Sequence, residues 1–177
     1  MCDTDEFLFP VQGKSLRHAL RDYDGYASLS VNWKLFNTGN VSRIPTDKLL
    51  IETLTSAHLH QDFNLKSIVK PRHVDFFISV HFPKLRSGFR QVTENFECFY
   101  GPFAPVESRK VFRINHYWVR DGDFLVSQKV NRTHVKKNKI GYLNSVYFPT
   151  LRDESIFKFI KELKAKIFPK NIFCKFY

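Results

Sequence analysis

Apolar and polar residues alternate strictly between residues 27 and 35, which is the pattern of a β-strand with one buried face. The apolar positions are Ala27, Leu29, Val31, Trp33 and Leu35, and the positions between them carry serine, asparagine or lysine. The pattern predicts an interior strand of a mixed sheet. We expect the Trp33 side chain on its buried face.

In other segments the apolar residues have a different spacing. Between residues 15 and 23, apolar residues recur at the three- and four-residue spacing of a short amphipathic helix, and Asp24-Gly25 ends it. Further elements are predicted as follows: strands at 66–70, 74–81 and 111–119, and helices at 123–131 and 153–168. Strands and helices mixed in this order predict one α/β or α+β domain.

Composition narrows the class of protein. The chain has 177 residues and a net charge of +11, which favours anionic partners such as nucleic acid, nucleotide phosphates or a lipid surface. A hydrophobic content of 43% excludes a disordered chain. No apolar run is long enough to cross a membrane, and the acidic start is unlike a signal peptide, so we expect a cytoplasmic protein. Cys2, Cys98 and Cys174 are far apart, which is typical of reduced thiols.

The first candidate site is a segment of acidic residues near the start of the sequence. Asp3, Asp5 and Glu6 lie within four positions, and acids two residues apart can place two carboxylates on one divalent cation. A solvated acidic segment explains the same residues. His116 is the second candidate: it shares one strand face with apolar side chains, where a histidine is either a hydrogen-bonded core residue or a metal ligand.

Basic residues form the third group. They occupy a predicted loop at 136–139 and one face of the last predicted helix, whose other face is apolar. That helix either docks on the core or makes a peripheral contact with anionic lipid. No hydrolase, nucleotide-loop, dinucleotide or zinc-protease motif occurs, so those classes lose most of their support.

Four segments carry a more specific signal: CDTDEFLFP at 2–10, SVNWKLFNTGN at 30–40, LKSIVKP at 65–71 and RINHYWVRDGDFLVSQKVNR at 113–132. In order and separation they resemble the catalytic and acceptor half of glycosyltransferase family 92 and related family 2-like enzymes with the GT-A fold. The resemblance covers most of the chain up to about residue 132. It implies an α/β fold with a partial GT-A-like mixed sheet and flanking helices.

The resemblance also implies roles for residues. Asp3 and Asp5 match the carboxylate motif that holds a divalent ion, Mn²⁺ or Mg²⁺, and the donor diphosphate. His116 is similar in placement to the third metal ligand. A Lys-Ser pair common in the family is Arg120-Asp121 here, which makes Arg120 the candidate for an altered contact to the phosphates. The implied activity is inverting transfer from a nucleotide-sugar, with UDP-galactose suggested by the family, to a glycan acceptor.

Such a transfer also needs a carboxylate that takes the proton of the acceptor hydroxyl. Glu52 is the first candidate, because it lies in the otherwise apolar run at 48–54, where its pKa could rise. Asp75 is the second. Each is equally compatible with an ordinary surface acid.

The chain departs from the family at two further places. The family's Phe-Gly-Ser-Ser-Gly-His loop is replaced by residues 36–40, Phe-Asn-Thr-Gly-Asn, so acceptor specificity does not carry over. Only Met1-Cys2 precedes the carboxylate motif, where the family has its nucleotide-binding half. We therefore expect a truncated chain or one completed by a second polypeptide, and no sugar transfer by this chain alone.

Two rival readings remain open. One is a non-catalytic basic module for nucleic acid or an anionic membrane surface, favoured by the net charge and by an aromatic content of 16%. Against it, no recognisable nucleic-acid-binding signature is present. The other is a folded remnant without present activity.

Overall fold

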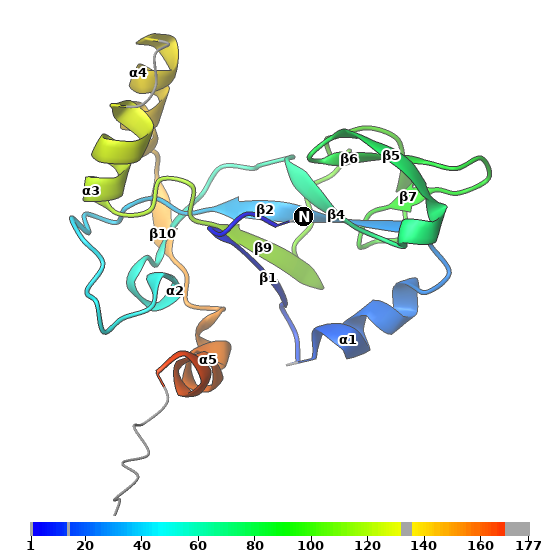
Figure 1. Cartoon of the computed structure of the whole chain (residues 1–177), viewed down its shortest axis with the longest axis horizontal. Coiled ribbons are helices and arrows are strands. Elements are labelled where there is room, and N and C mark those ends of the chain that lie inside the picture. The colour runs from blue at the N-terminus through cyan, green and yellow to red at the C-terminus, as the bar shows by residue number, and fades with distance from the viewer. Residues whose placement is uncertain (1, 14, 132–135, 169–177) are drawn as a thin grey trace, which may run out of the picture.

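A six-stranded mixed sheet forms the centre of the molecule, seen in a computed structural model that describes residues 2–13, 15–131 and 136–168 (Figure 1). Its strands are β1 (Glu6–Pro10), β2 (Ser28–Leu35), β4 (Leu65–Val69), β7 (Gln91–Val92), β8 (Cys98–Phe99) and β9 (Phe112–His116). The order is β1-β9-β2-β7-β8, and β4 pairs with β2 as well. Strand β9 runs antiparallel to β1 and parallel to β2.

Smaller elements surround this sheet. Two antiparallel pairs stand apart from it, β3 (Ser56–His58) with β10 (Thr150–Arg152), and β5 (Val74–Ser79) with β6 (Phe82–Leu85). The helical segments are α1 (Leu16–Ala19), η1 (Leu20–Tyr23), α2 (Leu50–Thr53), η2 (Pro71–His73), α3 (Gly122–Phe124), η3 (Leu125–Val130), α4 (Lys136–Ser145), η4 (Phe157–Phe159) and α5 (Ile160–Ile167). Among the described residues, no helix is both long and apolar enough to cross a bilayer.

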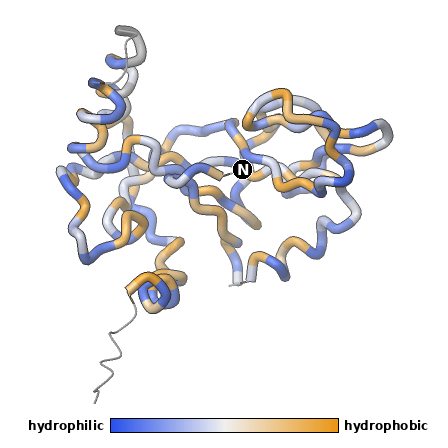
Figure 2. Tube along the Cα trace, viewed as in Figure 1, coloured by the Kyte–Doolittle hydropathy of each residue, from blue (hydrophilic) through white to orange (hydrophobic). Residues whose placement is uncertain are grey.

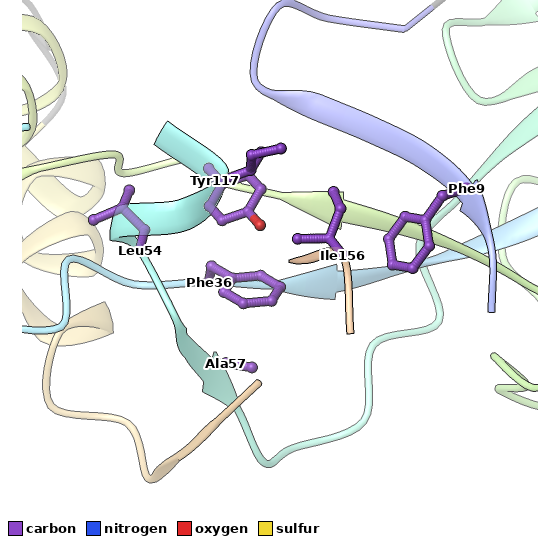
Figure 3. Packing of buried hydrophobic residues seen from close by; sticks show 7 residues of the cluster. Phe9, Phe36, Leu54, Ala57, Tyr117 and Ile156 are labelled. Carbon is purple, nitrogen blue, oxygen red and sulfur yellow. The ribbon is translucent and has the colours of Figure 1, made fainter. Parts of the chain in front are cut away.

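Side chains on the two faces of the sheet pack into two separate apolar clusters. On one face, the first cluster joins β1, the ends of β2 and β9, α2, β3 and the segment before α5 (Figure 3). Its buried members are Phe9, Phe36, Ile51, Leu54, Ala57, Tyr117 and Ile156. Leu29, Val31, Phe112 and Ile114 belong to the second cluster, which the α1–η1 segment covers. The centre of the sheet is therefore covered on both faces.

Because both faces of β2 are covered over most of its length, its polar residues are buried as well as its apolar ones. The strand predicted at 27–35 is confirmed, but the polar residues Ser28, Ser30 and Asn32 are buried too. Asn32 satisfies its amide by donating to the carbonyls of Asp62 and Asn64. Trp33 lies on the expected face but is only half-buried, because that face opens at this end of the sheet.

The other predicted strands and helices are present and differ in extent. A mixed sheet with few helices confirms the α/β class. The ambiguous run at 48–54 contains the short helix α2, and the expected loop at 136–139 is the start of helix α4. The apolar side of the last helix docks on the first cluster through Phe159, Ile160 and Leu163. Cys174 lies outside the described residues, whereas Cys2 and Cys98 are free thiols.

Candidate functional site

His116, one of the predicted site residues, lies at one end of the sheet, on the face of the second cluster. Residues paired directly across two strands point to the same face. Glu6 of β1 pairs with His116 of β9. Trp33 of β2 pairs with the residue two positions before His116, and Lys66 of β4 pairs with the residue two positions before Trp33. The side chains of Glu6, Trp33, Lys66 and His116 therefore share one surface.

Asp5 and His116 lie together at this place. The Asp5 Oδ1 atom is 3.8 Å from His116 Nε2, and the Asp5 carbonyl accepts a hydrogen bond from the Tyr117 amide at 2.9 Å. Burial lowers the pKa of His116 to about 4; Asp5 acts to raise it, while Lys129 and Lys66 lower it further. The imidazole is therefore neutral at pH 7 and keeps a nitrogen lone pair for a ligand.

Asp3 takes a different partner. Its Oδ2 atom lies 3.2 Å from the Lys66 ammonium, which is also 3.5 Å from Glu6 Oε1. The Asp3 carboxylate is 62% exposed, whereas the Glu6 side chain is fully buried. Burial raises the pKa of Glu6, against the lowering effect of a bond to the Asp3 backbone and of Lys66. Lys66 thus places a positive charge between two carboxylates.

The expected convergence of Asp3, Asp5 and His116 is therefore met in part. Asp5 and His116 come together, while Asp3 faces Lys66. Within residues 2–13, 15–131 and 136–168, no three His, Cys, Asp or Glu side chains are grouped closely enough to hold a metal ion. The assignment of these residues as metal ligands stays a prediction.

Trp33 forms an aromatic wall beside the pair. Its ring centroid is 4.3 Å from that of His116 and 5.1 Å from that of His81, with edge contacts in both cases, and the Lys66 ammonium lies 5.8 Å from it. His81 Nδ1 donates to the Leu65 carbonyl at 2.8 Å. Two imidazoles therefore flank one indole.

Arg120 follows β9 in a backbone turn. Its φ of 51° is in the left-handed region, and its amide donates to the Tyr117 carbonyl at 2.9 Å. The guanidinium lies over the Phe124 ring, 4.6 Å from the centroid, and its buried Nε has no hydrogen-bond partner among the described residues. The side chain is thus held at the start of α3 with donor capacity to spare.

Glu52 does not have the environment expected of it. Its carboxylate accepts from the Leu49 amide at 2.9 Å, as a cap of α2, and is 2.7 Å from the Lys164 ammonium. Burial acts to raise the pKa of Glu52, but these bonds outweigh it and hold the pKa below its ordinary value. The expected upward shift is wrong, because the sequence did not show that α5 brings Lys164 to this acid.

Asp75 lies on the separate β5–β6 pair. Its side chain is 46% exposed and 3.4 Å from Arg86. Both candidates thus have basic partners, and their assignment as the base stays a prediction.

Sequence reasoning assigned no role to Lys66 or His81. Glu6 was part of the acidic candidate segment, and period-two counting from β1 places it, like Leu8, on the face of the second cluster. Lys66 was visible only as a charged residue within a predicted strand. Its partners are Glu6 on β1 and Asp3 just before that strand, so the ion pairs could be found only once the strand order was known.

Comparison with known proteins does not add a family to these observations: no protein-family model and no curated protein matches the chain.

Proposed function

We propose that this chain contributes the metal and diphosphate end of a metal-dependent inverting glycosyltransferase. The donor would be a nucleotide-sugar, with UDP-galactose the first to test, and the acceptor a glycan. One observation supports the proposal above the others. Asp5 and His116, which are far apart in the sequence and come from two of the four segments that carry the resemblance, lie 3.8 Å apart.

The residues fit a divalent cation in donor type. Asp5 offers carboxylate oxygen, and His116 offers a neutral imidazole whose buried Nδ1 has no hydrogen-bond partner among the described residues. Asp3 is mostly exposed, and it would have to leave Lys66 to join them. When bound, Mn²⁺ or Mg²⁺ would neutralise charge on the departing diphosphate.

The chain's own groups would do the rest. Asp5 and His116 hold and orient the ion, and Arg120, from its position after β9, donates hydrogen bonds to a phosphate oxygen. Transfer with inversion requires one more carboxylate to receive the acceptor proton. Asp75 and Glu52 remain the candidates, although a lowered pKa makes Glu52 the weaker base.

Manganese binding to the purified chain tests the proposal. Electron paramagnetic resonance measures free Mn²⁺ in the presence and absence of UDP. We expect Asp5→Asn and His116→Gln each to weaken Mn²⁺ binding about tenfold or more, whereas Asp75→Asn, an exposed carboxylate in an ion pair, leaves it unchanged. Arg120→Gln should weaken UDP binding about tenfold with little effect on Mn²⁺.

Two results would overturn the proposal. One is the absence of Mn²⁺ binding even with UDP present. The other is Mn²⁺ binding that neither Asp5→Asn nor His116→Gln changes.

A further inference from the structure

The β5–β6 hairpin exposes an unusual run of apolar side chains. Phe76, Phe77 and Ile78 are 59%, 50% and 50% exposed, and Val80 in the turn is 65% exposed. Consecutive strand residues point to opposite faces, so β5 presents apolar groups to solvent on both of its faces. A hairpin that docked on its own core would bury one of them. Contiguous exposed apolar residues mark an interaction surface.

Basic residues surround this run. Between residues 70 and 90 the chain has five Lys or Arg and a single acid, Asp75, which is paired with Arg86 at 3.4 Å. Lys84 lies on β6, and the loop that carries Arg86 and Arg90 is tied back to the hairpin. The Arg86 amide donates to the His73 carbonyl at 3.0 Å, and the rings of His73 and Phe89 stack with centroids 3.8 Å apart.

A pocket of about 460 Å³ adjoins the same residues, with Lys84, Arg86 and Arg90 in its wall beside the aromatic rings of Phe89 and Tyr100. Tyr100 is 74% exposed at its edge. The pocket thus combines cationic donors and aromatic rings next to the apolar run. The hairpin also lies at the end of the molecule remote from α5 (Figure 1), and hydrophobic and hydrophilic stretches adjoin along it (Figure 2).

We propose that the β5–β6 hairpin is a membrane anchor that inserts into the interface of an anionic bilayer. Phe76, Phe77, Ile78 and Val80 enter the boundary between headgroups and acyl chains, where aromatic side chains are favoured. Lys84, Arg86 and Arg90 pair with lipid phosphates, whose attraction for basic residues is largest within a Debye length of the surface. This proposal does not rest on the proposed sugar transfer.

A bilayer fits this surface better than a nucleic acid does. Bases stack on aromatic rings, but Ile78 and Val80 are aliphatic and offer them no stacking face. Aliphatic side chains do partition into the acyl region. The mixture of aromatic and aliphatic groups along β5 and in its turn, with basic residues nearby, therefore selects lipid.

Vesicle co-sedimentation of the 177-residue protein tests the anchor. Vesicles of phosphatidylcholine are compared with vesicles that also contain phosphatidylserine. We expect binding to the anionic vesicles only, a loss of about tenfold for Phe77→Ser/Ile78→Ser, and a loss of about fivefold for each of Lys84→Gln and Arg90→Gln. The matched control is Val126→Ser/Leu151→Ser, which changes two residues 50% and 65% exposed outside the hairpin and should bind as the parent does.

The substituted side chains are exposed, so the variants should keep the circular dichroism spectrum and urea midpoint of the parent. Equal binding of the hairpin variant and the control variant would overturn the anchor. So would binding of an oligonucleotide, but not of vesicles, that Phe77→Ser/Ile78→Ser abolishes. Size-exclusion chromatography that shows a dimer lost in the same variant, without vesicle binding, would assign the surface to a second copy of the chain instead.

Discussion

Lys66 carries a buried positive charge that is paired with Glu6. Replacing Lys66 with methionine measures how much this ion pair contributes to the free energy of unfolding. Lys66→Met keeps the length of the side chain and removes the ammonium 3.5 Å from Glu6. At an effective dielectric of about 20, two charges at that distance attract by about 5 kcal/mol. Breaking a buried pair costs about 3–5 kcal/mol. The Asp3 contact adds less than about 1 kcal/mol, because that carboxylate is mostly exposed.

Urea unfolding followed by tryptophan fluorescence gives the free energy of unfolding. We expect Lys66→Met to lower it by about 3–5 kcal/mol at pH 8. The double variant Lys66→Met/Glu6→Gln should recover most of the loss, since a neutral amide replaces the abandoned carboxylate. The single variant Glu6→Gln serves as the matched reference.

The pH dependence of the stability lost in Lys66→Met tests whether the unpaired Glu6 carboxylate causes that loss. Burial already raises the pKa of Glu6 above 4.5 in the folded parent, and loss of Lys66 raises it further. A folded pKa above the unfolded one means that the folded state binds the extra proton, so stability falls as pH rises from 4.5 through the folded pKa. The deficit of Lys66→Met should therefore shrink at low pH and grow toward pH 8. An equal deficit at pH 5 and pH 8, or one below about 1 kcal/mol, would refute the reasoning.

Four further outcomes are expected. In the manganese titration, Lys66→Met should bind Mn²⁺ more tightly, because Asp3 is released; unchanged or weaker binding contradicts competition between lysine and metal. The His116 ring should titrate near pH 4 by NMR, because burial lowers its pKa from 6.5. The contribution of the neutral ring to the free energy of unfolding is therefore lost as pH falls from 6.5 through 4. A titration midpoint near 6.5 contradicts this. Trp33→Ala should cost less than the roughly 3–5 kcal/mol of a fully buried tryptophan, since the ring is half-buried; a larger loss in urea contradicts that exposure. Glu94→Ala should cost about 3 kcal/mol or more, because the carboxylate accepts from three consecutive amides ending at Phe112, whereas the exposed Glu97→Ala should cost little.

The sequence predicted local structure well where a pattern was set by neighbours in the chain. The alternation at 27–35 located β2 because the sheet's pleat imposes a period of two. The same alternation missed the burial of Ser28 and Ser30, since it contains no information on what covers the second face. Helix α4 was missed because its first residues carry no apolar periodicity, only charge.

The candidate site shows the same limit. Asp5 and His116 were predicted to lie close, and they do. The partner of Asp3 was not predicted, because Lys66 reaches it through a strand order that no local pattern encodes. Glu52 illustrates the converse: an apolar neighbourhood in sequence suggested a raised pKa, while a helix more than a hundred residues later supplies the lysine that lowers it.

The position of β9 between β1 and β2 has a consequence for how the chain is made. Residues 6–10 and 33–35 hydrogen-bond to the same strand at 112–116 and not to each other. A ribosome extends the chain from its N-terminus, so both segments leave the exit tunnel long before their shared partner exists. Pairings this distant in sequence close slowly. Until residue 116 has emerged, Phe7 and Phe9 have no strand to pair with, and their side chains stay exposed on the nascent chain.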